Sequence, residues 1–140
     1  MDIKVTISKA ASQREAAFTV RYTVFVKEQG FVDRLDDIDA TAYHAVAYDG
    51  DKIIGCGRFF GEGEVYHIGR IAVLPEYREK GVGALIMQEI ESFAKGIGVR
   101  RLELSAQRRA KGFYDKLCYT AVSEEYLEEG YPHTAMAKEI

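Results

Sequence analysis

The stretch Ile71–Leu85, IAVLPEYREKGVGAL, contains the pattern that decides the fold. Its first residues are apolar, as in a buried strand, and Pro75 ends that strand because proline has no backbone N–H to offer a sheet. Gly81 and Gly83 then lead into an amphipathic helix, whose apolar residues recur at helical spacing as far as Ile97. The stretch therefore predicts a strand, a short glycine-containing turn and a helix in direct succession.

A turn of this kind is suited to binding an anion. The first N–H groups of a helix lack partners within the helix, and the helix dipole places partial positive charge at the same end. Gly81 and Gly83 let the backbone approach an anion closely, and Arg78 and Lys80 add positive charge. These features suit a pyrophosphate group. The alternative interpretation is that the glycines only form a tight turn.

The spacing of the glycines disfavours two other kinds of phosphate loop. The pattern is not GxxxxGK(S/T), because Lys80 precedes the glycines and no Ser or Thr follows to bind magnesium. It is not GxGxxG either, because Gly83 is followed by Ala84, Leu85 and Ile86. We therefore do not expect a nucleoside triphosphate or dinucleotide fold.

Strands and helices are predicted along the rest of the chain. An Asp-Gly pair at 49–50 between two β-rich segments predicts a hairpin, and Ser12 with Glu15 has the spacing of a helix capping box. The acidic residues 33–39 are predicted to form a solvated loop. The predicted strands are 4–7, 42–48, 52–60, 65–73, 101–105, 120–122 and 134–138, and the predicted helices are 12–28, 81–97 and 110–117. This order, β-α-β-β-β-α-β-α-β-β, predicts an α/β sandwich with a mixed central sheet and flanking helices.

Length and composition limit the class of protein. The 140 residues fit a single domain, 1–140, and 47% hydrophobic with 29% charged residues is ordinary globular usage. The formal net charge of -3 leaves no basic excess for binding nucleic acid. The sequence contains neither an apolar run of ~18 residues for a membrane span nor a signal peptide at its start. We therefore expect a cytoplasmic protein with neither a nucleic-acid nor a membrane partner.

The cysteines and histidines show no metal or nucleophile motif. Cys56 and Cys118 belong to no CxxC pair, and in a reducing compartment we expect both to be small core residues. The histidines are scattered without HxH or HExxH spacing, so no metal site is predicted. His44 is flanked by strand residues and is predicted to be buried and hydrogen-bonded. Arg58, a lone cation in an apolar strand, pairs either with an acidic substrate group or with an aspartate of the predicted loop.

Four segments resemble one enzyme family, in the order in which that family has them. Arg78–Gly83, REKGVG, matches the acyl-CoA signature (Q/R)xxGx(G/A) of the GCN5-related N-acetyltransferases, or GNAT family. Gly112–Tyr119 resembles that family's FYxKxGF segment but departs from it, because Cys118 stands where glycine is usual and tyrosine replaces the last phenylalanine. Arg21–Gln29 and Gly130–His133 further resemble the small bacterial ElaA/YjcF-like branch of the family.

The resemblance implies that acetyl-CoA is the cosubstrate and donates its acetyl group to an amine acceptor. In the family, pantetheine lies between two splayed strands, which implies a position along Ile71–Val73 and opposite Ser105. The pyrophosphate is implied to lie on the amides at the helix start. The implied cofactor-binding residues are Ile71, Ala72, Val73, Arg78, Lys80, Gly81, Val82, Gly83, Ala84 and Ser105. The resemblance is also compatible with a homodimer.

Two residues are catalytic candidates. Tyr114 occupies the family's usual position for the group that protonates the departing thiolate, and its alternative is a core aromatic. Glu28 is a candidate base or amine-binding carboxylate, because an ammonium must lose a proton before it can attack; its alternative is a solvated acid at a helix end. The predicted function is N-acetyl transfer to a primary amine of a small molecule or peptide. The alternative is a non-catalytic acyl-CoA-binding or sensing module on the same scaffold.

Overall fold

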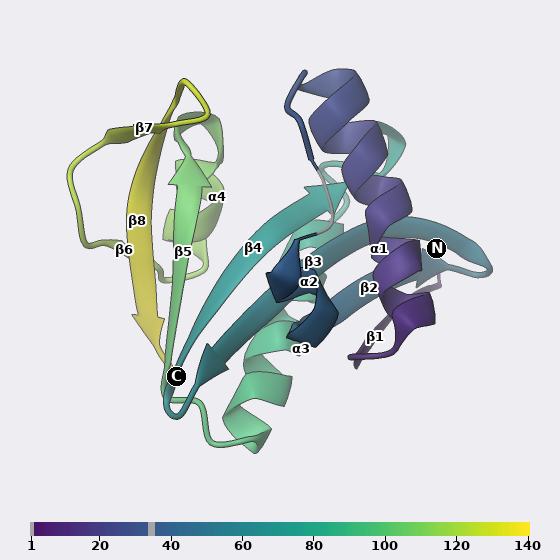
Figure 1. Ribbon diagram of the computed structural model, residues 1–140, viewed down its shortest axis with the longest axis horizontal. Coiled ribbons are helices and arrows are strands. Elements are labelled where there is room, and N and C mark those ends of the chain that lie inside the picture. The colour runs from purple at the N-terminus through teal and green to yellow at the C-terminus, as the bar shows by residue number, and fades with distance from the viewer. Residues whose placement is uncertain (1, 34–35) are drawn as a thin grey trace.

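The computed structural model describes residues 2–33 and 36–140, which form an eight-stranded mixed sheet with helices on both faces (Figure 1). The strand order is β1-β2-β3-β4-β5-β8-β6, with β7 paired to β8. The β4–β5 pair is parallel, and the other pairs are antiparallel. The strands are β1 Ile3–Ser8, β2 Tyr43–Asp49, β3 Lys52–Glu62, β4 Val65–Val73, β5 Arg101–Gln107, β6 Thr120–Ala121, β7 Tyr126–Glu128 and β8 Tyr131–Glu139.

Helices α1 and α3 cover opposite faces of the sheet, because neighbouring residues of one strand point to opposite sides. On β2, Val46 packs with the apolar residues of α1, whereas Ala45 and Ala47 pack with those of α3. The helices are α1 Ala11–Arg21, α2 Asp37–Thr41, α3 Val82–Gly96 and α4 Lys111–Lys116; a π-helical turn, Tyr22–Glu28, continues α1, and 3-10 turns span Pro75–Tyr77 and Arg108–Ala110. No helix in the described residues is long and apolar enough to cross a membrane.

Strands β4 and β5 pair over only part of their length and then separate. Their register runs from Val65 opposite Arg101 to Ile68 opposite Leu104. Beyond that point a bulge bends β4: Cys56 faces Ala72 and Arg58 faces Gly69, so β4 has one more residue than β3 between the two pairs. Arg70, within the bulge, has a φ of 54°. Figure 1 shows β5 with β8 diverging from β4 along the rest of their length.

Most of the predicted elements are present, and the hairpin around Asp49–Gly50 joins β2 to β3 as predicted. The capping box at Ser12 is wrong: α1 already begins at Ala11, and no side chain caps it. The first turn is instead attached to the sheet by Gln13, whose Nε2 donates to the carbonyls of Thr6 at 2.7 Å and His44 at 3.1 Å. Tertiary hydrogen bonds thus fix a helix start that local spacing misplaces by two residues, because the N-cap is Ala10 and not Ser12.

The predicted loop at 33–39 is wrong in part. Asp36 caps the short helix α2, and its side chain accepts from the amide of Asp39, whose side chain accepts from the amide of Asp36. Residues 34 and 35 of that loop lie outside the described residues, as does position 1. Strand β7 is an addition to the predicted order, and its three exposed residues show no alternation that would have indicated a strand.

Candidate active site

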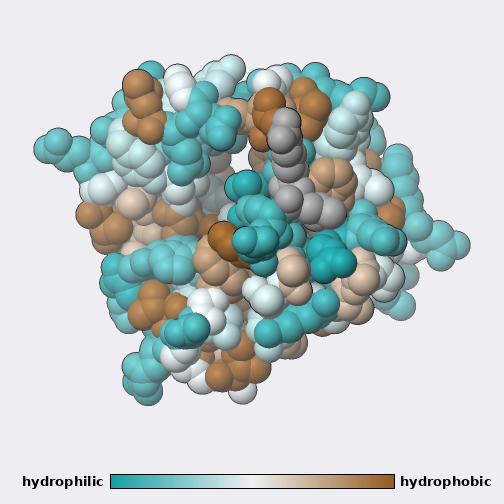
Figure 2. All heavy atoms as spheres, in the orientation of Figure 1, coloured by the Kyte–Doolittle hydropathy of each residue, from teal (hydrophilic) through white to brown (hydrophobic). Residues whose placement is uncertain are grey.

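A cavity of about 700 Å³ lies where β4 and β5 separate. Its lining includes the bulged part of β4, the end of β5, Tyr114 of α4 and Phe25 of the π-helical turn. Figure 2 shows the molecule hollowed at this place, between the part that contains β5 and β8 and the part that contains α1. Gln107 at the end of β5 donates to Gln29 at 3.1 Å, which joins the two sides.

The separation leaves one backbone edge of β4 without a neighbouring strand among the described residues. Ala72 and Val73 pair with β3 on the other edge, but the β4–β5 register ends at Ile68. Unpaired backbone groups at such an edge can hydrogen-bond to an extended ligand. Ile71 lines the cavity, Ala72 is buried on the α1 side, and the Val73 carbonyl accepts from Arg78 Nε at 3.0 Å. The segment Ile71–Val73, which the family resemblance assigns to pantetheine, therefore has a backbone edge that no strand of the described chain covers.

The turn after β4 places the start of α3 next to this edge. Gly81 is the N-cap with a φ of 81°, a left-handed conformation that favours glycine, and no side chain caps the helix. The first amides of α3 therefore have no partner within the helix. A Cβ at Gly83 would lie 3.2 Å from Phe113 Cζ, so this glycine also lets α4 pack closely against α3. Lys80 is exposed, with Nζ 5.7 Å from the centre of the Tyr77 ring.

The sequence suggests Arg78 for binding the cofactor and Glu28 for catalysis. In this structure the two side chains form an ion pair. Arg78 Nη1 and Nη2 donate to the two carboxylate oxygens of Glu28, with Nη2 at 2.5 Å. The hydrogen bonds from Arg78 lower the pKa of Glu28 below its ordinary value. A carboxylate with a lowered pKa is a weaker base, so the ion pair disfavours proton abstraction by Glu28 as long as Arg78 holds it. Its catalytic role stays a prediction.

Tyr114 lies on α4 and is 8% exposed. Its ring makes edge-to-face contacts with Phe113 at 5.0 Å and Tyr119 at 6.0 Å, so the core-aromatic alternative describes part of its surroundings. Tyr114 also lines the cavity, and among the described residues its hydroxyl has no hydrogen-bond partner. Burial raises the pKa of Tyr114. The hydroxyl is protonated at neutral pH and is available to donate a hydrogen bond into the cavity.

Ser105 faces the cavity from β5, where its hydroxyl hydrogen-bonds with the hydroxyl of Tyr126. Tyr126 belongs to β7, the strand that the sequence did not predict. Glu128 on the same strand lies 3.5 Å from the Ser105 hydroxyl. Strand β7 thus adds two polar side chains to the β5 side of the cavity that sequence reasoning missed.

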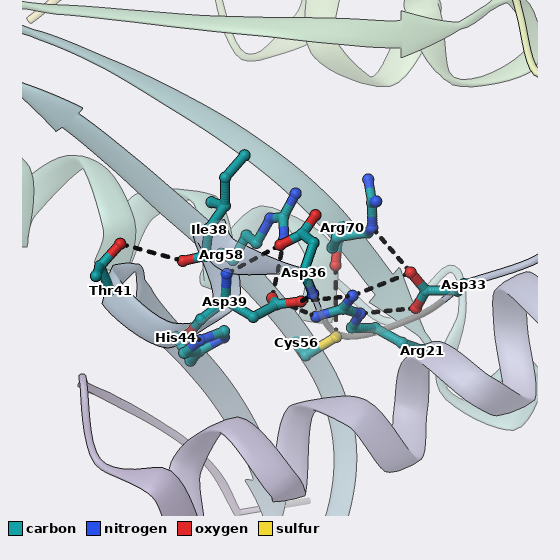
Figure 3. Close-up of polar contacts among 10 residues, drawn as sticks. All are labelled: Arg21, Asp33, Asp36, Ile38, Asp39, Thr41, His44, Cys56, Arg58 and Arg70. Carbon is teal, nitrogen blue, oxygen red and sulfur yellow. Dashed lines mark hydrogen bonds and ion pairs between the residues drawn. The ribbon is translucent and has the colours of Figure 1, made fainter.

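A group of charged residues, some of them buried (Figure 3), lies beside the cavity, and Asp33, Arg58 and Arg70 of this group line it. This arginine–aspartate cluster consists of Arg21, Asp33, Asp36, Asp39, Arg58 and Arg70. Arg58 Nη1 donates to Asp36 and Asp39 at 2.9 Å each, so its partner is the predicted loop. The expectation that the loop is solvated is wrong for Asp39, which is only 2% exposed, whereas Asp36 and Asp37 are exposed. Burial would raise the pKa of Asp39, but the hydrogen bonds from Arg21, the Asp36 amide and Arg58 lower it overall.

The remaining predictions, which concern histidine and cysteine residues, have different outcomes. His44 is buried and its Nε2 lies 3.0 Å from the Asp39 carbonyl, which confirms the prediction. Cys56 is fully buried, and burial raises its pKa to about 12. Cys118 is exposed, so its prediction as a core residue is wrong. It has a φ of 71°, which is the left-handed conformation for which the family pattern uses glycine. Within residues 2–33 and 36–140 no group of side chains is arranged to hold a metal ion.

Three comparisons with known proteins agree with this architecture. The acetyltransferase (GNAT) domain model matches residues 8–140. YjcF of Bacillus subtilis (strain 168), named as an N-acetyltransferase, is 39% identical over 140 residues, which cover 98% of this chain and 100% of that protein. The crystal structure of Escherichia coli ElaA has a TM-score of 0.88 and 27% identity and covers 99% of this chain and 100% of its own. An acyl-CoA N-acyltransferase from Pseudomonas aeruginosa has the same fold, with a TM-score of 0.86, 22% identity and coverage of 98% and 99%. The chain belongs to the GNAT family of acetyltransferases.

Proposed function

We propose that this acetyltransferase moves the acetyl group of acetyl-CoA to a primary amine of a small molecule or peptide. The observation that carries the proposal is the separation of β4 from β5 over a cavity that Tyr114 lines, next to the uncapped start of α3. One long ligand could then reach from the helix start, along the open edge of β4, into the cavity. Acetyl-CoA has that shape, with a pyrophosphate at one end and a thioester at the other.

The residues present fit acetyl-CoA in three respects. The amides of Gly81, Val82, Gly83 and Ala84 would hold the pyrophosphate at the helix start, where no side chain competes for them. Lys80 would add positive charge there, and so would Arg78 if the ligand displaced Glu28 from it. The open edge of β4 at Ile71–Val73 would pair with pantetheine as an added strand does, with Ser105 across the gap on β5.

The chemistry of transfer requires a base, an oxyanion site and an acid. Acetyl-CoA supplies an activated acyl carbon with a thiolate leaving group. The acceptor ammonium loses a proton, the neutral nitrogen bonds to the acyl carbon and loses a second proton, and the carbon–sulfur bond then breaks to leave a thiolate that takes up a proton. The amide of Val73 would donate to the oxyanion and the hydroxyl of Tyr114 to the departing sulfur. Because Arg78 holds Glu28, a water chain is the favoured route for the acceptor proton in this arrangement.

A panel of amines with acetyl-CoA, followed by release of free thiol, tests the proposal. An enzyme releases CoA steadily when a suitable amine is present. A module that only senses acyl-CoA would bind the ligand but would not turn it over. Amine-independent release would instead indicate hydrolysis.

We expect CoA to raise the melting temperature of the protein by several degrees. A ligand that binds only the native state stabilises it, by about 2.7 kcal/mol when its concentration is a hundred times Kd. Scanning calorimetry with and without saturating CoA measures the effect, and adenosine serves as the control because it lacks both the pyrophosphate and the pantetheine. An unchanged midpoint at millimolar CoA would count against a CoA site.

Replacing Gly83 with aspartate should weaken CoA binding at least about tenfold relative to replacing it with alanine. Both variants place a Cβ near Phe113, and the closest ring atom is 3.2 Å away. Only aspartate adds negative charge beside the proposed pyrophosphate position. Titration calorimetry gives both affinities, and circular dichroism checks that both variants fold. Equal CoA affinity in the two folded variants would place the pyrophosphate elsewhere.

A further inference from the structure

Arg58 has hydrogen-bonding capacity that its protein partners do not use. The residue is 5% exposed and lines the cavity from β3. Its Nη1 donates to Asp36 and Asp39, whereas its Nε is buried and has no partner among the residues that the structure describes. Its Nη2 has no hydrogen bond to any described residue either. A guanidinium binds a carboxylate with two parallel hydrogen bonds through such an edge, as Arg21 does with Nε and Nη2 on Asp33.

Arg70 adds a second guanidinium with spare donors. Within the described part of the chain only its Nε is engaged, by Asp33 at 3.1 Å, and the side chain is 38% exposed. Figure 3 shows the guanidinium groups of Arg58 and Arg70 on the side of the aspartates that faces away from α1. Both residues line the same cavity, on neighbouring strands.

The hydrogen-bonding groups that the arginine–aspartate cluster leaves unused toward the cavity are N–H donors. Both oxygens of Asp33 accept from Arg21, and one also accepts from Arg70. Both oxygens of Asp39 accept from Arg21, and one also accepts from Arg58. Arginine has five N–H donors and no acceptor, so the donors left over can be satisfied only by water or by an acceptor group on a ligand. A buried N–H without a partner is costly, which favours a ligand that brings an anion.

The other residues that line the cavity indicate which groups such a ligand carries besides its anion. Phe25, Phe31 and Phe60 line the cavity, and the Arg58 guanidinium carbon lies 5.7 Å from the centre of the Phe60 ring. Apolar walls lower the local dielectric and strengthen a charge-assisted hydrogen bond. Glu103 and Glu128 line the β5 side and carry charge of the opposite sign. The cavity therefore offers arginine N–H donors beside Asp33 on one wall, carboxylates on the β5 side, and aromatic side chains in the same lining.

We propose that Arg58 and Arg70 form a carboxylate subsite, so that the acceptor is an amine that also carries a carboxylate, as an amino acid with an apolar side chain does. The inference about the acceptor rests on the proposed function, since it assumes an amine acceptor. The carboxylate subsite itself does not rest on it, because a carboxylate that has no amine should also bind.

The test compares 3-phenylpropanoate with 3-phenylpropanamide by titration calorimetry. The two probes have the same shape and differ in charge, and neither has an amine that could be acetylated. We expect the carboxylate to bind at least tenfold more tightly. Replacing Arg70 with glutamine should remove most of that preference, and Asp33 keeps its two hydrogen bonds from Arg21 in this variant. Arg109→Gln, which removes another arginine of the same cavity, is the matched control and should keep the preference.

Replacing Arg58 with lysine extends the test to the buried arginine of the proposed subsite. Arg58→Lys keeps a positive charge for Asp39 but loses the two-donor edge, so we expect the carboxylate preference to fall in the folded variant. Equal binding of the two probes to the parent protein would overturn the subsite. So would a preference that survives Arg70→Gln or that disappears in Arg109→Gln.

Turnover separates this inference from the proposed function. L-phenylalanine should be acetylated with a higher kcat/KM than L-phenylalaninamide, although the amide has the less basic amine and so more of it is neutral. Faster turnover of the amide would overturn the inference and leave the proposed function intact. Selective binding of 3-phenylpropanoate without acetylation of any amine would leave the subsite intact and overturn the proposed function.

Discussion

Replacing Tyr114 with phenylalanine is expected to lower kcat about ten- to a hundredfold and to change the affinity for acetyl-CoA little. The ring stays, so its contacts with Phe113 and Tyr119 survive. The variant loses one hydroxyl, whose raised pKa keeps it protonated and available to the departing sulfur. General acids contribute roughly 10²–10⁴-fold, and a thiolate is already a fair leaving group, so we expect the low end.

The matched control for this variant is Tyr119→Phe. Tyr119 is also buried, but its hydroxyl donates to Glu91 at 2.9 Å and the residue does not line the cavity. Its loss should therefore lower stability and leave kcat unchanged. The two variants are compared by single-turnover kinetics, in which chemistry limits the rate. Parental turnover in Tyr114→Phe would make Tyr114 a packing residue, whereas a collapse of CoA binding would make its hydroxyl an anchor for the cofactor.

Replacing Arg21 with methionine is expected to lower the free energy of unfolding by about 3–5 kcal/mol. Arg21 is 1% exposed and holds two buried aspartates, Asp33 at 2.8 Å and Asp39 at 2.7 Å. Removing the cation leaves both carboxylates buried without their main partner, and the cost of an uncompensated buried charge is large. Urea denaturation measures the loss from the midpoint and the slope.

An exposed arginine provides the comparison. Arg101 pairs with Glu103 and Glu139 at 2.8 Å, but its side chain is 34% exposed, so Arg101→Met should lower the free energy of unfolding far less than Arg21→Met does. Similar losses in the two variants would mean that burial does not decide the strength of the cluster.

The parts of the fold that sequence could predict are those with a local cause. The strand, turn and helix of Ile71–Leu85 follow from apolar periodicity and from glycines at the helix start, and β4 and α3 lie there. The hairpin at Asp49–Gly50 follows from turn chemistry. Most of the residues named for CoA binding come from the one continuous segment 71–84, whereas Ser105 lies on β5 beyond the point where the β4–β5 pairing ends.

The parts that sequence could not predict depend on contacts between distant residues. The cluster joins Asp36 to Arg58 across 22 positions and Asp33 to Arg70 across 37, and a single sequence does not show such pairs. Arg58, as a lone cation in an apolar strand, is the one sign of this cluster in the sequence, and it is compatible with two kinds of partner. The bond between Glu28 and Arg78 spans 50 positions and was hidden for the same reason. Strand β7 exists because β8 offers it an edge, which its own three residues do not indicate.

The most direct test of the account follows both products of one reaction: free CoA thiol and acetylated amine. The reaction contains the protein, acetyl-CoA with an isotopically labelled acetyl group, and an amine that also carries a carboxylate. We predict that thiol and labelled amide form together in equal amounts, and that both slow by the same factor in Tyr114→Phe. If CoA binds to saturation but no amine in the panel acquires the label, the protein is a binding module and the proposed function is wrong.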